Sequence, residues 1–308
     1  MSAIDLLNGA MAAEDDRLTR EFGPPEKPVV IVFSQPRGAS TLFQQLAISC
    51  LDIGYISNLL ARFWRAPYLG AQLEQSVRDP EYVSNFGSRY GNVAGAQEPH
   101  EWGWFWRHWL KLGGDETYCP QSVQIDSGGL LGKLGALEAV VGSSLLIDSI
   151  YAITNFDLLV SLLPRVVVVR LRRDLYYICN SHLNARLSRH GDIGAFYGHR
   201  PKNIEEILAI EDPVEQVVAQ VKASEQEMLE TLKPFGAEGV FDMAYSDLVA
   251  KPQDAMNRFA EFLNDNGAGV RMLRPLPQLD LENRDNPRYI RAEHRERLDH
   301  YYSIYFKD

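Results

Sequence analysis

Short apolar runs alternate with longer stretches of helical spacing along most of this chain. The runs at 29–33, 54–57, 145–147, 165–172 and 239–243 are brief and largely rich in β-branched residues, which predicts buried strands. Between them, apolar residues recur with helical spacing at 42–50, 128–141, 156–163, 175–187, 214–232 and 252–263. This alternation predicts an α/β fold of three layers, with a central, mainly parallel sheet and helices on both faces.

The remaining segments are polar and fit around this pattern. Residues 1–26 predict a peripheral N-terminal arm or short helix, and residues 188–212, with several Gly and His, predict a lid. Residues 288–305 predict a charged C-terminal helix. The chain has 308 residues and no internal repeat, so we expect a single domain over 1–308.

Ligands of parallel α/β sheets bind at the carboxyl ends of the strands. The loop that follows the first strand runs from Ser34 to Thr41 and leads directly into a helix. A helix start offers unpaired backbone N–H groups and a positive dipole end, to which Arg37 adds a cation and Ser40 and Thr41 add hydroxyls. The loop therefore predicts an anion site, although an ordinary turn capped by Ser40 is the alternative.

This loop is not a Walker A motif, because it lacks the Gly-Lys-[Ser/Thr] ending of GxxxxGK[ST]. The charge composition restricts the class of ligand further. The formal net charge of −10 argues against general binding of nucleic acids or anionic membranes, while a local basic pocket for a small anion remains compatible with it.

The three cysteines, Cys50, Cys119 and Cys179, have no CxxC spacing, so they predict neither a zinc site nor a disulfide framework. We expect them to be small core residues. The sequence holds no apolar run of membrane-spanning length and no secretory signal pattern, which favours a cytoplasmic location.

The segment from Pro36 to Thr41 and the stretch from Arg172 to Ser181 together resemble two motifs of the sulfotransferase family that uses 3′-phosphoadenosine 5′-phosphosulfate. The segment Pro36-Arg37-Gly38-Ala39-Ser40-Thr41 resembles the PRSGTT loop of that family. The stretch from Arg172 to Ser181 resembles RRDPLDTCLS without a gap and departs at Leu175 and Tyr177. A weaker match to YEDLVADP covers 245–252, where we expect Tyr245 and Leu248 only to pack.

This resemblance implies a P-loop NTPase-like sulfotransferase fold of the bacterial type, with 3′-phosphoadenosine 5′-phosphosulfate as co-substrate and no metal. In the family the first motif holds the 5′-phosphosulfate and the second holds the 3′-phosphate. Carried over, the donor-binding residues are Arg37, Gly38, Ala39, Ser40, Thr41, Arg173 and Ser181. Arg37 is also implied as a catalytic residue at the bridging and leaving oxygens.

The family uses a His or Glu as the base that accepts the acceptor's proton. One family position for Glu is occupied here by Ser57 and Asn58 and cannot serve. The next candidates are His100, which we favour, then Glu98, with Glu101 as a further candidate. The alternative is that the two carboxylates begin a helix while His100 faces solvent.

The other histidines of the second half, His182, His190 and His199, are expected to be surface or lid residues. The aromatic residues at 102–109 are expected to be mostly core, with one or two lining an acceptor pocket. Asp148 stands where the family often has a Lys, and nothing in the sequence places Lys133.

The resulting hypothesis is in-line transfer of a sulfuryl group to a hydroxyl acceptor. Small molecules, lipids, sugars and peptides all remain open as acceptors, as does the oligomeric state. A nucleotide kinase or other phosphotransferase of related fold is one alternative, and a non-catalytic nucleotide-binding protein is the other.

Overall fold

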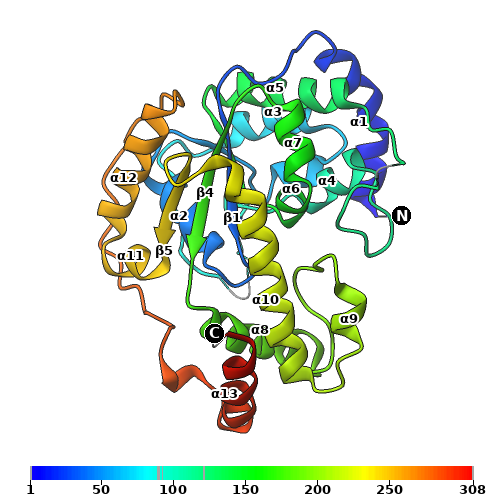
Figure 1. Ribbon diagram of the computed structural model, residues 1–308. Helices are drawn as coiled ribbons and strands as arrows, with labels where there is room; N and C mark the ends of the chain where they lie inside the picture. Colours follow the sequence, from blue (N-terminus) through cyan, green and yellow to red (C-terminus); the bar gives the residue numbers. More distant parts are fainter. Residues whose placement is uncertain (1, 89–90, 92, 121, 307–308) are drawn as a thin grey trace. The chain divides into compact units, whose positions relative to one another are not determined.

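The computed structural model describes residues 2–88, 91, 93–120 and 122–306. In this part of the chain the strands form a five-stranded sheet in the order β2-β3-β1-β4-β5. Strands β1, β4 and β5 are labelled in Figure 1. Strand β3 pairs in parallel with both β1 and β2. The α/β class predicted from the alternating pattern is confirmed. The strands are β1 Val29–Ser34, β2 Gly54–Tyr55, β3 Leu145–Ile147, β4 Val166–Arg172 and β5 Val240–Ala244.

Helices separate the strands along the chain. The α-helices are α1 Ala3–Thr19, α2 Ser40–Cys50, α3 Pro67–Val77, α4 Gly103–Trp109, α5 Ser127–Val141, α6 Ile150–Thr154, α7 Phe156–Leu162, α8 Leu175–His190, α9 Ile204–Leu208, α10 Pro213–Leu232, α11 Tyr245–Ala250, α12 Pro252–Asp265 and α13 Ala292–Phe306. Short 3₁₀ turns lie at η1 Leu60–Phe63, η2 Lys233–Phe235 and η3 Pro287–Tyr289.

Strand β1 leads into the predicted anion loop and is completely buried along its length. Its register against β3 places Val30 opposite Leu146 and Ile31 opposite Ile147. A strand buried on both faces reads as a continuous apolar run, which is why β1 and β3 could be predicted from sequence.

Contacts divide the chain into two compact units, and β1, α2 and β4 each have residues in both. The first unit comprises residues 2–32, 41–169 and 252–277. In it, α1 packs on α3 and α5 (Figure 1). The rings of Phe43 in α2 and Phe259 in α12 lie 4.9 Å apart and belong to its core.

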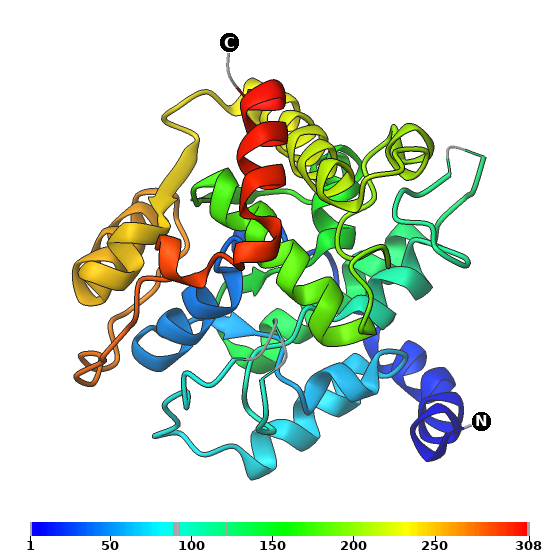
Figure 2. The same ribbon diagram turned by 90° about the horizontal axis from the view of Figure 1, so that it is seen from below.

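The second unit comprises residues 33–40, 170–251 and 278–306. Helices α8, α10 and α13 pack around a common core to which Leu183, Val217 and Leu298 contribute (Figure 2). This unit contains most of the residues that the two sequence motifs single out.

A helix boundary near the C-terminus differs from the sequence prediction. The C-terminal helix begins at Ala292 instead of residue 288. Pro287 sits in the first turn of η3, whose C-cap Ile290 is extended and separates it from α13.

Among the described residues, no helix has the length and apolar character needed to cross a membrane.

Candidate active site

The loop between β1 and α2 has a tightly specified backbone. The Gly38 amide donates to the Gln35 carbonyl at 2.7 Å and closes a turn. Arg37 and Ala39 adopt left-handed conformations, with φ values of 74° and 79°, which cost an L-residue roughly 1–2 kcal/mol each. A Cβ at position 38 would lie 2.3 Å from Ser34 Oγ and 2.8 Å from the Gln35 carbonyl oxygen, so only glycine fits there. Backbone strain of this kind gathers at functional sites.

Side chains of the second unit hold this loop in place. The Gln35 amide donates to the Glu225 carboxylate at 3.2 Å, and Glu225 also accepts from Arg170 at 2.8 Å. His182 Nε2 lies 3.1 Å from the Pro36 carbonyl oxygen. The loop is therefore fixed by α10, β4 and α8.

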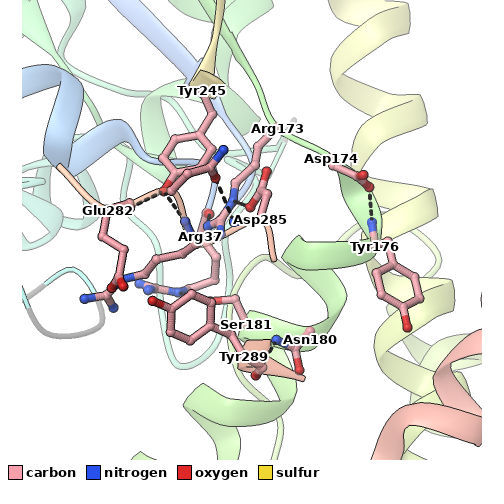
Figure 3. Close-up of polar contacts among 12 residues, drawn as sticks. Arg37, Arg173, Asp174, Tyr176, Asn180, Ser181, Tyr245, Glu282, Asp285 and Tyr289 are labelled. Atoms are coloured by element: carbon pink, nitrogen blue, oxygen red, sulfur yellow. Dashed lines mark hydrogen bonds and ion pairs between the residues drawn. The ribbon is translucent and has the colours of Figure 1, made fainter. Parts of the chain in front are cut away.

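The structure brings the two sequence motifs together. Arg37 Nε donates to Ser181 Oγ at 3.0 Å, and Arg173 Nη1 donates to the Arg37 carbonyl at 2.7 Å across 136 residues of sequence (Figure 3). Ser40 begins α2, so its N–H lies among those that an α-helix leaves without an intrahelical partner. Two guanidinium groups, a hydroxyl and a helix start thus converge in the second unit, and this combination suits a phosphorylated ligand.

Arg173 has two further partners that the sequence did not indicate. Its Nε donates to Asp285 Oδ1 at 2.7 Å, and its Cζ lies 4.6 Å from the centroid of the Tyr245 ring. Tyr245 packs as predicted, since it is 7% exposed, and it also supports the guanidinium. The sequence feature that could have indicated this contact is the position of Tyr245 directly after β5, in the segment resembling YEDLVADP.

Burial shifts the pKa of two side chains near the loop, His182 and Asp285. It lowers the pKa of His182 to about 3, so the ring is neutral at pH 7. Because a carbonyl only accepts, Nε2 carries the ring proton and donates it to Pro36. Burial also raises the pKa of Asp285, while the charge of Arg173 acts in the opposite direction.

The expectation that His182 and His199 lie at the surface is wrong. They are 1% and 4% exposed. Each has a polar partner in the second unit, His182 at the Pro36 carbonyl and His199 at Ser224 Oγ, 3.0 Å from Nδ1. Burial lowers the pKa of His199 to about 4. His190 is exposed, as expected.

Thr41, the last residue of the loop motif, belongs to the first unit, where α2 continues. Two consecutive glutamines on this helix are buried and bind carboxylates. Gln44 donates to Asp148 at 2.7 Å, and Gln45 donates to Glu98 at 3.0 Å. Asp148, which stands where the family often has Lys, is thus held by an amide.

Glu98 is fully buried and surrounded by donors. Besides Gln45, it accepts from the Tyr82 hydroxyl at 2.6 Å, the Ser84 hydroxyl at 2.9 Å and the Asn85 backbone N–H at 2.8 Å. Both carboxylate oxygens therefore have partners. This network fixes the position of the side chain and engages the lone pairs that a general base would need.

The segment that carries Glu98 lies beside residues 57 and 58. Ser57 forms an isolated antiparallel bridge with Pro99, and the Asn58 N–H donates to the Glu98 carbonyl at 2.8 Å. The fold thus brings the segment of Glu98 next to Ser57 and Asn58, the residues that the sequence resemblance to the family rules out as a base. Nothing in the sequence pattern predicted this juxtaposition.

His100 is exposed, and one of its nitrogens is engaged. Its Nδ1 accepts the Trp102 backbone N–H at 2.8 Å. Burial of part of the ring and the charge of Arg62 lower its pKa, so it is neutral at pH 7. In the neutral ring the proton then lies on Nε2, and a base role requires Nδ1 to release the amide. Glu101 is also exposed.

The other first-unit residues from the sequence analysis have mostly structural surroundings. Lys133 is 1% exposed and pairs with Asp15 at 2.6 Å and with Asp16 at 2.7 Å. The aromatic cluster is mainly core, because Trp102, Phe105, Trp106 and Trp109 are buried, whereas Trp104 is 65% exposed. Within the described ranges, no cluster of three or more His, Cys, Asp or Glu side chains is arranged to hold a metal ion.

Sequence comparison finds no relative: no family model matches the chain, and no curated protein matches it. Solved structures do match. Sulfotransferase STF1 from Mycobacterium tuberculosis H37Rv superimposes with a TM-score of 0.52 at 14% identity, covering 84% of this chain and 72% of that one. Sulfotransferase STF9 from Mycobacterium avium gives 0.51 at 18% identity, covering 96% and 73%. The chain therefore has the fold of the sulfotransferases.

Proposed function

We propose that this protein is a sulfotransferase that uses 3′-phosphoadenosine 5′-phosphosulfate. The acceptor hydroxyl oxygen forms a bond to sulfur as the bond from sulfur to the 5′-phosphate oxygen breaks. The hydroxyl proton passes to a base, and 3′-phosphoadenosine 5′-phosphate leaves. The observation that carries the proposal is the meeting of Arg37, Ser181 and Arg173 through two hydrogen bonds.

The donor residues divide between the two phosphate groups. We assign Arg37, Gly38, Ala39, Ser40 and Thr41 to the 5′-phosphosulfate. Arg173 and Ser181 are assigned to the 3′-phosphate. A strained loop at a helix start suits the first group, because its amides are fixed before the ligand arrives. Arg37→Ala should then lower the transfer rate by on the order of 10²–10³, as loss of one preorganised donor does.

For the base we propose His100 first, then Glu98, with Glu101 as a further candidate. His100→Ala should keep donor binding and lose transfer by roughly 10²-fold or more. Because the Trp102 N–H donates to His100 Nδ1, this hydrogen bond must break before Nδ1 can accept a proton. We therefore expect the transfer rate to depend on that rearrangement. Wild-type turnover in His100→Ala would move the role to Glu98 or Glu101, which Glu98→Gln and Glu101→Gln then separate.

Calorimetry tests the donor assignment without any acceptor. We expect 3′-phosphoadenosine 5′-phosphate to bind at least tenfold more tightly than adenosine 5′-phosphate. Arg173→Ala should remove most of this preference. Arg172→Ala is the matched control, because this neighbouring side chain is 50% exposed and pairs with Asp242. Equal binding of the two nucleotides by the wild-type protein would refute the assignment.

A non-catalytic nucleotide-binding protein is the second candidate, and one observation favours it. Both leading base candidates are engaged in hydrogen bonds, Glu98 with four donor groups and His100 with the Trp102 amide. Transfer of labelled sulfate from the donor to a panel of phenols, alcohols and sugars separates the two. Tight bisphosphate binding without transfer to any of them would support the binding protein.

A further inference from the structure

A carboxylate lies against the guanidinium that we assign to the 3′-phosphate. Arg173 Nε donates to Asp285 Oδ1 at 2.7 Å, and the two side chains are only 9% and 15% exposed. The same guanidinium donates to the Arg37 carbonyl at 2.7 Å and lies over the Tyr245 ring. Asp285 thus binds, from within the chain, an arginine placed to bind an anion.

The segment that carries Asp285 is anchored on both sides of it. The Tyr245 hydroxyl donates to the Glu282 carbonyl at 3.4 Å and accepts from the Arg284 N–H at 3.1 Å. Beyond Asp285, the Asn180 amide donates to the Tyr289 carbonyl at 3.2 Å (Figure 3). We call residues 278–290 the Asp285 strap. Its anchors come from α11 and α8, the helices that carry Tyr245 and Ser181.

The charges around the Arg173–Asp285 ion pair allow a phosphate to replace the Asp285 carboxylate. Arg173 is the cation that compensates the partly desolvated Asp285, while Asp174 acts on Asp285 as a like charge. A phosphate monoester carries up to two negative charges and three acceptor oxygens, whereas a carboxylate carries one charge and two. A phosphate arriving at Arg173 can therefore replace Asp285 as the ligand of the guanidinium.

We infer that Asp285 is an internal competitor of the donor's 3′-phosphate and sets the affinity for the donor. This inference rests on the proposed function, because it takes Arg173 as the 3′-phosphate ligand. Without the donor, the Asp285 carboxylate accepts from Arg173 Nε. When the bisphosphate binds, its 3′-phosphate takes the place of the carboxylate, so part of its binding free energy is spent on the exchange.

Asp285→Asn tests this with little change in shape. The amide oxygen can still accept from Arg173 Nε, but the charge that competes with phosphate is gone. We expect the variant to bind 3′-phosphoadenosine 5′-phosphate at least tenfold more tightly than the wild-type protein, with binding of adenosine 5′-phosphate unchanged. Glu282→Gln is the matched control, because it removes one charge from the same strap where the side chain pairs with Arg288.

A second variant pair places the effect on Arg173. In the Arg173→Ala background, Asp285→Asn should change bisphosphate affinity less than twofold, because the competition acts through the missing guanidinium. If Asp285→Asn binds the bisphosphate as the wild type does, or more weakly, the inference is overturned and Asp285 only positions Arg173. If the wild-type protein itself shows no preference for the bisphosphate, the proposed function fails first. The two failures are thereby distinguishable.

Discussion

Replacing His182 with glutamine should remove a defined part of the pH dependence of the free energy of unfolding. The imidazole is 1% exposed, and its Nε2 donates to the Pro36 carbonyl at 3.1 Å. Its Nδ1 is buried without a partner among the described residues. A glutamine amide at this position can keep the bond to Pro36 and does not titrate.

The magnitude follows from the pKa of the ring in the two states. Burial first, and then the charges of Arg37 and Arg186, lower the pKa of His182 from 6.5 to about 3. Because the folded value is depressed, the stabilisation is present above pH 6.5 and is lost as the pH falls towards 3. Between pH 7.5 and 5.5 the unfolded chain gains close to one proton here and the folded chain gains none. Linkage then gives a loss of about 1.4 kcal/mol.

Urea unfolding at pH 7.5 and pH 5.5 measures this loss. The wild-type protein should lose about 1.4 kcal/mol more between the two pH values than His182→Gln does. His199, whose pKa is about 4 for the same reason, should contribute a similar amount in both proteins and cancel from the comparison. The exposed His190 provides the control through His190→Gln. Equal pH dependence in the wild type and His182→Gln would refute a buried, neutral His182.

Other predictions concern the loop and a buried ion pair. Ala39→Gly should raise the free energy of unfolding by about 1 kcal/mol in urea titrations, since φ is 79° there. Gly38→Ala should abolish bisphosphate binding in calorimetry, because its Cβ would lie 2.8 Å from the Gln35 carbonyl oxygen. Lys133→Ala should cost about 3–5 kcal/mol of unfolding free energy by leaving Asp15 buried without its cation. Lys133→Met with Asp15→Leu should recover most of that loss; a double variant no more stable than Lys133→Ala would contradict the reasoning.

The elements that could be predicted from the sequence are those whose character is evident from a few consecutive residues. Strand β1 is buried along its length, and Val167, Val168 and Val169 of β4 are buried as well. A strand segment covered on both faces favours a continuous apolar run. The prediction of an anion site at the loop from Pro36 to Thr41 has a similar local basis. The small residues, hydroxyls and arginine of the loop are all contiguous with a helix start.

The rest of the site depends on pairings across the chain. Asp285 lies 112 residues from Arg173, in a strap without periodicity, so no local pattern indicates its partner. Gln45 and Glu98 are 53 residues apart, and each side chain on its own reads as an ordinary polar position. His182 carries no sign of burial either, because a histidine on a helix suits a surface as well as a core. Such pairings form only when distant segments come together in the tertiary structure.

Helix α1 is attached to the rest of the first unit largely through buried polar side chains. Two of its buried residues contact the rest of the unit through polar groups. Asn8 binds the Arg62 carbonyl and the Arg65 amide, and Asp15 binds the Leu69 amide and Lys133. If α1 detached, Lys133 would lose Asp15 and Asp16, the two carboxylates that pair with it. Fraying of the N-terminus should therefore open α3 and α5 with it, and trimming residues 2–19 would destabilise the interior of the first unit instead of removing an inert tail.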